Sequence, residues 1–95
     1  MKLYKIPPRI RITRRTTYEV VYTDEFKDKN QMGECNPESK QITLKNGMSN
    51  TNIITTFIHE VIHSLSLEND FPLTEKQVES LERSIYRMLR LNKWL

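Results

Sequence analysis

The pattern of apolar and polar residues changes from strand-like alternation in the first half of the chain to helical spacing in the second. Residues 9–13 alternate charged and apolar side chains, and residues 16–23 are rich in β-branched and aromatic types. Each stretch therefore predicts a strand. Residues 32–35 and 40–45 flank Asn-Pro-Glu-Ser, which has turn chemistry, and they predict a hairpin. The first half thus predicts a sheet of three or four strands.

The second half predicts two helices joined by a short connector. The first helix is expected over residues 50–67, with Ser49 or Asn50 as its N-cap. The second is expected over residues 74–91. Pro72 lies between them and discourages helical backbone at the residue before it. The two helices should therefore pack against each other in antiparallel fashion.

The second predicted helix has a clear start and an apolar stripe. Thr74 and Gln77 form a capping box, in which each side chain bonds to the backbone of the other residue. Apolar side chains then recur at helical spacing and are expected to face the core. They are Val78, Leu81, Ile85, Met88 and Leu89. After the helix, Trp94 and Leu95 are expected to pack back on the body of the domain.

The length and the order of these elements predict one small α+β domain over residues 1–95. An N-terminal arm, residues 1–8, precedes a sheet portion over residues 9–45. We expect a small, mainly antiparallel sheet packed with the two helices.

Both histidines of the chain lie in the first predicted helix, in the sequence H-E-x-x-H. His59 and His63 are four residues apart and so lie on one helix face, one turn apart. Two imidazoles in this arrangement can bind one Zn²⁺, and Glu60 between them can hold and deprotonate a zinc-bound water. On a helical wheel the histidines share a polar sector opposite the apolar one, which favours a metal site. The less specific interpretation is a surface helix with two solvent-facing histidines.

A catalytic zinc site needs a third protein ligand besides an open position. No further histidine exists, and Cys35 lies far upstream, so a carboxylate after the first helix is expected. On the wheel of the second helix, three glutamates share a sector bordering the apolar stripe. The candidates are Glu68, Asp70, Glu75, Glu79 and Glu82. Geometry read from the sequence does not separate them.

Several stretches together resemble a known family. Residues 57–65, 73–81 and 85–89, with Gly-Glu-Cys at 33–35 ahead of the strand at 41–44, are similar to small phage and prophage zinc metallopeptidases related to the ImmA/IrrE group. H-E-x-x-H is the one sharp motif in this resemblance, which covers about two-thirds of the chain. It implies a minimal zincin-like fold, with the motif on the first helix.

The resemblance also implies a third metal ligand and a substrate. In the family this ligand is a glutamate of the following helix, and Glu79 occupies its place, with Glu82 as the second choice. Glu82 and Arg83 stand where the family usually has a small residue and an asparagine. The implied substrate is an intracellular protein, such as a repressor, in a phage or mobile-element setting.

Further residues are candidates for contacting the substrate. The strand containing Met32, Gly33, Glu34 and Cys35 could receive an extended peptide by β-addition, as the resembling peptidases do. Tyr86 lies two turns beyond Glu79 on nearly the same side of its helix, so its phenol could stabilise an oxyanion. The ordinary alternatives are a tyrosine that packs in the core and a cysteine that serves as a small buried residue.

Charge and composition narrow the class of protein. The formal net charge of +3 and the pI of about 9.1 suit a soluble protein and do not by themselves imply a nucleic-acid partner. Two groups of basic residues are expected to form solvated faces, with nucleic-acid binding as the alternative. They are Arg83, Arg87, Arg90 and Lys93 on the second helix, and Arg9, Arg11, Arg14 and Arg15 near the first strand.

A single cysteine allows no intramolecular disulfide and favours a reducing compartment. The N-terminal sequence lacks the apolar run of a signal peptide, and no stretch is long enough for a membrane span. We therefore expect a cytoplasmic protein with no membrane partner.

The sequence thus predicts a zinc-dependent metallopeptidase that hydrolyses peptide bonds of a protein substrate. Two alternatives come from other classes of protein. One is a non-catalytic interaction protein stabilised by a bound metal. The other is a basic nucleic-acid-binding module in which H-E-x-x-H occurs by chance.

Overall fold

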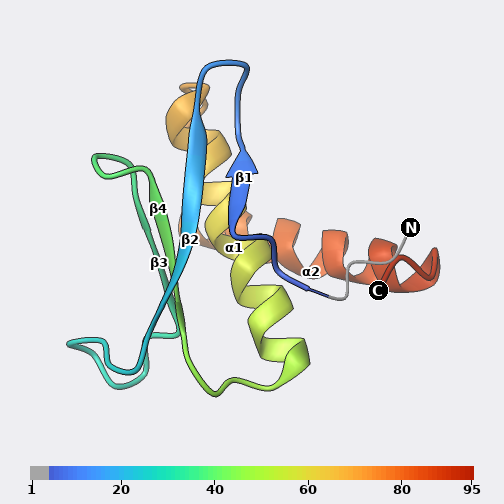
Figure 1. Ribbon diagram of the computed structural model, residues 1–95. Coiled ribbons are helices and arrows are strands. Elements are labelled where there is room, and N and C mark those ends of the chain that lie inside the picture. Colours follow the sequence, from blue (N-terminus) through green and yellow to red (C-terminus); the bar gives the residue numbers. More distant parts are fainter. Residues whose placement is uncertain (1–4) are drawn as a thin grey trace.

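A computed structural model describes residues 5–95 as a four-stranded sheet followed by two helices (Figure 1). Half of the predicted N-terminal arm, residues 1–4, thus lies outside the described residues. The elements in chain order are β1 (Arg9–Arg11), β2 (Thr17–Thr23), β3 (Gly33–Asn36), β4 (Gln41–Lys45), α1 (Asn50–Glu68) and α2 (Glu75–Leu91). The α+β class and all six predicted elements are confirmed, with ends that differ by at most two residues from those expected.

The sheet is mixed, with the strand order β1-β2-β4-β3. The predicted hairpin of β3 and β4 is confirmed as an antiparallel pair, and β1 pairs antiparallel with β2. The central pair, β2 and β4, is parallel. It is parallel because β3 runs back along the far side of β4, so β4 returns in the direction of β2. This order leaves β3 at one edge of the sheet and β1 at the other.

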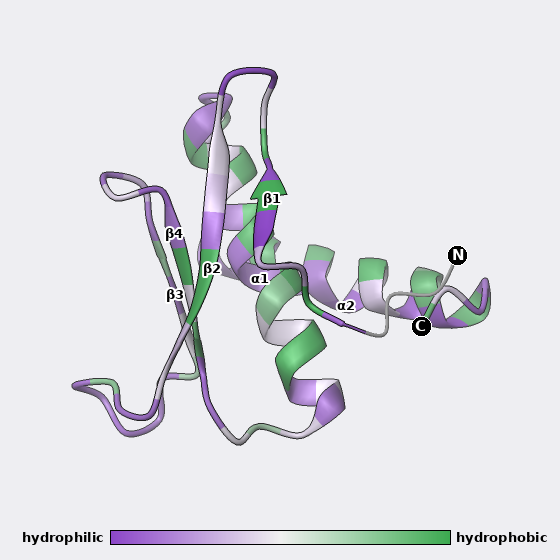
Figure 2. Ribbon diagram, in the orientation of Figure 1, coloured by the Kyte–Doolittle hydropathy of each residue, from purple (hydrophilic) through white to green (hydrophobic). Residues whose placement is uncertain are grey.

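Helix α1 lies between the sheet and α2, so it packs on two sides (Figure 1). One side meets the sheet, where Ile42 and Leu44 of β4 are fully buried. The other side meets α2, and Ile58 and Ile62 of α1 form a second core there with Val78. Apolar residues accordingly occur on several sides of α1, whereas α2 has a narrower apolar stripe (Figure 2). Because two sides of α1 are covered by these cores, its histidines lie on the part of the helix surface between them.

The helix starts follow the predicted capping chemistry. The side chain of Ser49 accepts a hydrogen bond from the backbone of Asn52 at the start of α1. The Thr74–Gln77 capping box is present at the start of α2, with both reciprocal bonds formed.

Neither helix of residues 5–95 combines the length and the apolar character that crossing a bilayer would require.

The apolar stripe of α2 is less covered than predicted. Val78 and Leu89 are buried, but Leu81 and Met88 are 41% and 47% exposed. The prediction that these two residues face the core is therefore wrong. Helix α2 packs on α1 and not on the sheet, so only the narrow line of residues facing α1 is covered. At the C-terminus Leu95 packs against this second core, whereas Trp94 stays about half exposed.

Candidate metal centre

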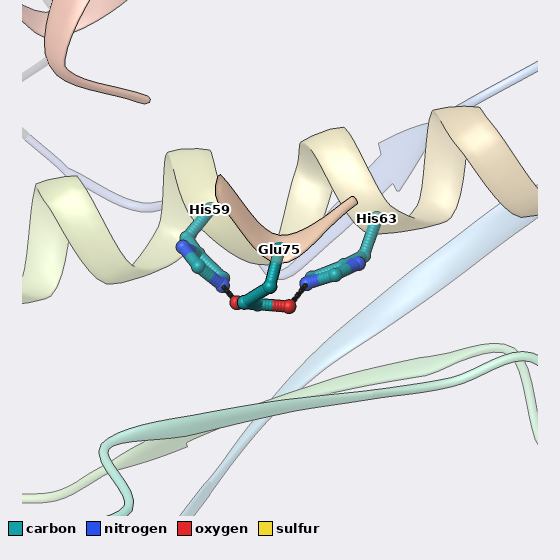
Figure 3. A group of neighbouring side chains, drawn as sticks. All are labelled: His59, His63 and Glu75. Atoms are coloured by element: carbon teal, nitrogen blue, oxygen red, sulfur yellow. Dashed lines mark ion pairs between the residues drawn. The ribbon is translucent and has the colours of Figure 1, made fainter. Parts of the chain in front are cut away.

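The two histidines of α1 and the first residue of α2 converge on one point (Figure 3). The Nε2 atom of His59 lies 2.7 Å from Oε1 of Glu75, and Nε2 of His63 lies 3.2 Å from Oε2 of the same carboxylate. One ligand atom from each of the three residues lies within 4.8 Å of the others. The imidazole rings stand one turn apart, with centroids 4.9 Å from each other. Two nitrogens and one carboxylate oxygen can therefore reach a common ion.

A second carboxylate contacts the opposite side of the His59 ring. Oε1 of Glu82 lies 2.8 Å from Nδ1 of His59, which donates the hydrogen bond because an ionised carboxylate only accepts. Metal-binding histidines commonly make this kind of bond, which directs the other ring nitrogen toward the metal. Glu82 thus holds the ring so that Nε2 faces Glu75.

Helix geometry explains why these two glutamates reach the same histidine. Glu75 and Glu82 are seven residues apart, close to two turns, so they lie on one face of α2. That face borders the buried residues of α2. These buried residues pack against α1 near His59. In the part of the chain that the structure describes, neither glutamate forms an ion pair with a lysine or an arginine. Their negative charges are directed toward the imidazoles instead.

The pKa of His59 reflects these opposing influences. Burial by itself lowers the pKa of His59, but the hydrogen bond to Glu82 and the negative charges of Glu60, Glu75 and Glu82 outweigh it. The net direction is upward, so its surroundings favour a positive charge on the His59 imidazole.

Glu60 lies beside the histidines and under the edge strand. Only 7% of its surface is exposed, and burial raises its pKa to about 7, against the lowering effect of His59. Gly33 of β3 lies directly over it: a Cβ atom added at Gly33 would come within 2.5 Å of Thr56 Cγ2 and 3.0 Å of Glu60 Oε2. The glycine therefore lets β3 approach α1 closely enough to cover Glu60.

Two hollows lie on either side of the contact between Gly33 and Glu60. One, of about 400 Å³, extends from Met32 along α1 to Thr55 and reaches α2 at Glu79. The other, of about 330 Å³, extends past His63 and Glu75 and includes Glu34 and Cys35. His59, Glu60 and Gly33 line both hollows. Together they form a groove between the edge strand β3 and the two helices, with the candidate metal centre along it.

The structure brings most of the predicted site residues to this groove. His59, Glu60 and His63 lie together, and all four residues of the predicted substrate strand line one or both hollows. The thiol of Cys35 faces the core between sheet and helix, and burial raises its pKa to about 11. A neutral thiol of this kind is a poor metal ligand.

The carboxylate that meets the histidines is Glu75, rather than the predicted Glu79. Glu79 is exposed and lines the hollow on the Met32 side, and the group of possible ligands in residues 5–95 does not include it. Glu82, the second choice, contacts the outer nitrogen of His59 instead. The seven-residue spacing of Glu75 and Glu82 is the signal that could have identified the pair, because it allows both sides of one imidazole to be contacted.

Tyr86 does not reach the groove in the structure. It packs against the core between α1 and α2 and lines a third hollow, which neither histidine lines. The packing alternative is the one that the structure favours for this residue.

The donor set fits a zinc ion. Two imidazole nitrogens and one carboxylate oxygen are a ligand combination of catalytic zinc sites, which leave a fourth position for water or substrate. A carboxylate bonded to the outer nitrogen of one imidazole and a buried glutamate next to the ligands complete the arrangement. The chain matches no family model, no curated protein and no solved structure.

Proposed function

We propose that this protein is a zinc-dependent metallopeptidase with a minimal zincin-like fold. The observation that carries the proposal is the convergence of both Nε2 atoms and the Glu75 carboxylate beside a buried Glu60. His59, His63 and Glu75 would hold the ion, and Glu82 would orient His59 through its outer nitrogen. When bound, zinc would supply the Lewis acidity that polarises a peptide carbonyl.

Glu60 acts as the general base in this proposal. Its carboxylate accepts a proton from the attacking water and later returns that proton to the leaving amine. A general base works best when its pKa is near the working pH, and burial under β3 holds the pKa of Glu60 at about 7. The glycine at position 33 allows this burial while keeping the carboxylate at the groove.

The edge strand β3 offers a docking site for an extended peptide. The carbonyl of Met32 accepts a bond from the backbone of Lys45 on β4. Backbone groups alternate in direction along a strand, so those of Gly33 and Cys35 face the open edge. The side chain of Gln31 donates to the Gly33 carbonyl at 3.1 Å, and a docking peptide would replace this bond. A peptide added there passes directly over Glu60.

The resemblance to the ImmA/IrrE group suggests the kind of substrate. We propose an intracellular protein, such as a repressor, cleaved in the cytoplasm of a cell that carries a phage or mobile element. Two other functions remain to be distinguished by experiment. They are an interaction protein that uses the metal to join α1 and α2, and a nucleic-acid-binding module.

The first experiment measures metal content. We expect purified protein to contain about one zinc per chain, and we expect His59→Ala and His63→Ala to lose it. The matched control is Asn50→Ala, which changes an exposed residue at the start of the same helix. A wild-type protein that binds no zinc would overturn the proposal and favour the nucleic-acid-binding module.

The second experiment separates catalysis from metal binding. Glu60→Gln should keep the zinc but lower the rate of peptide cleavage by about 10²–10⁴-fold, the usual contribution of a general base. Glu25→Gln, in an exposed loop, serves as the control. If zinc-loaded wild-type protein is stabilised by the metal but cleaves none of a proteome-derived peptide library, the interaction protein is the better description.

A further inference from the structure

The C-terminal half of α2 carries three arginines beside a hollow that adjoins the groove. Arg83, Arg87 and Arg90 line this hollow of about 310 Å³, and we call these three residues the arginine row. All three are exposed. Within residues 5–95 none of them lies close enough to a carboxylate to form an ion pair. Their charges are therefore available to a ligand.

Stabilisation of α2 by its dipole or by ion pairs along the helix does not explain the presence of all three arginines. Basic residues stabilise the last turn of a helix through its dipole, and Arg90 is in that turn. Arg83 and Arg87 lie nearer the middle of α2, where this effect is weak. Glu79 is four residues before Arg83, a spacing that favours pairing along a helix, yet the two form no ion pair.

The arginine row continues the groove of the candidate metal centre. Its hollow shares Thr55, Glu82 and Arg83 with the 400 Å³ hollow that His59 and Glu60 line. Arg87 and Arg90 are five and eight residues beyond Glu82, or about 7.5 and 12 Å along the helix axis. An extended peptide covers that distance in about two to four residues.

The direction of β3 determines which part of a peptide would meet the arginine row. A peptide that adds antiparallel to β3 runs from Cys35 toward Met32, and Met32 lines the hollow next to the arginine row. The residues after the scissile bond would therefore reach the arginines. Nearer the candidate metal centre, Glu60, Glu79 and Glu82 line the groove and would repel a negative side chain.

We propose that the arginine row is a subsite for acidic side chains, located about two to four residues C-terminal to the scissile bond. This inference rests on the proposed peptidase function. Guanidinium groups match carboxylates in geometry as well as charge, because each can donate two parallel hydrogen bonds. The substrate class is then a protein whose cleavage site is followed by aspartate or glutamate.

The test profiles cleavage of a proteome-derived peptide library by zinc-loaded protein, using mass spectrometry. For the wild type we expect Asp and Glu to be enriched about threefold or more over the library background at the second to fourth positions after the cut. Arg87→Glu/Arg90→Glu should remove this enrichment, and Arg87→Lys/Arg90→Lys should keep part of it. The matched control is Arg14→Glu/Arg15→Glu, an equal charge change in the turn after β1, near the opposite edge of the sheet.

Cleavage without acidic enrichment, or enrichment lost equally in the control variant, overturns the subsite and leaves the peptidase function intact. If the library is not cut at all, the peptidase function fails, and binding decides the subsite. The probe is then a fluorescein-labelled peptide with four glutamates, compared by anisotropy with its glutamine analogue. Tighter binding of the glutamate peptide that Arg87→Glu/Arg90→Glu abolishes supports an acidic docking surface, and equal binding of the two peptides overturns it.

Discussion

Helix α1 carries two polar clusters that balance their charges in different ways. At its C-terminal end, Glu68 accepts 2.6 Å hydrogen bonds from the Lys40 ammonium and the Tyr18 hydroxyl. The Lys40 bond and then the Tyr18 bond lower the pKa of Glu68. This cluster supplies its own cation and joins α1 to the sheet.

The cluster near the middle of α1 has no such cation. Glu60, Glu75 and Glu82 surround two imidazoles, and in the described residues no lysine or arginine pairs with them. A protonated histidine, a protonated Glu60 or a bound metal would offset this negative charge. The comparison teaches that a self-neutralised cluster stabilises a fold, whereas an acidic cluster around imidazoles is suited to binding a cation.

The largest expected effect comes from a substitution that disrupts the middle cluster and leaves the cluster around Glu68 intact. Glu75→Ala removes a proposed ligand, so we expect zinc affinity to fall by more than about 100-fold, beyond the usual cost of losing an outer partner. Glu79→Ala, one turn further on the same exposed face, should change the affinity by less than about threefold. Competition with a chromogenic chelator measures both. The reverse order would assign the third ligand to Glu79, as the sequence resemblance predicts.

A smaller effect is expected from the outer carboxylate. Glu82→Ala leaves the three proposed ligands in place but frees the His59 ring to rotate, because the 2.8 Å bond to Nδ1 is lost. Zinc affinity should fall by about 10–100-fold. The same chelator competition tests this, with Ser84→Ala, at an exposed position of α2, as the control. An unchanged affinity would contradict the role of Glu82 in orienting the ring.

The contact between β3 and α1 gives a third prediction. Gly33→Ala places a methyl group against Thr56 and Glu60, and we expect it to lower the free energy of unfolding by about 1–3 kcal/mol. It should also slow peptide cleavage, because Glu60 must move. Gly47→Ala is a matched control: its φ of 82° makes alanine unfavourable, but nothing lies within 4 Å. Urea unfolding and cleavage rates together separate the two variants, and equal losses of activity in both would argue against this contact.

The smallest effect concerns the self-neutralised cluster. The pKa of Glu68 is lower in the folded protein, so its contribution to stability is present at neutral pH. That contribution is lost as the pH falls from the ordinary value of 4.5 through the folded pKa. Glu68→Gln should therefore flatten the acid side of a plot of melting temperature against pH. Glu38→Gln, in the exposed β3–β4 turn, should keep the wild-type slope, and added zinc should not restore what Glu68→Gln loses.

Much of the fold follows from local sequence signals. The capping residues Ser49 and Thr74 set the helix starts, and alternation of side chains located the strands, because these depend on neighbours a few residues away. The parallel pairing of β2 with β4 and the exposure of Leu81 and Met88 were not predictable in this way. Each depends on where distant segments pack, which a local pattern does not encode.

The candidate site likewise depends partly on local sequence and partly on the packing of distant segments. The sequence by itself determined that His59 and His63 share one face of a helix with Glu60 beside them, because helical periodicity makes residues four apart neighbours. Only the tertiary structure decided which glutamate of α2 meets them. Glu75, Glu79 and Glu82 lie on nearly the same helix face, and the way α2 packs across α1 selects Glu75 for the Nε2 atoms and Glu82 for Nδ1.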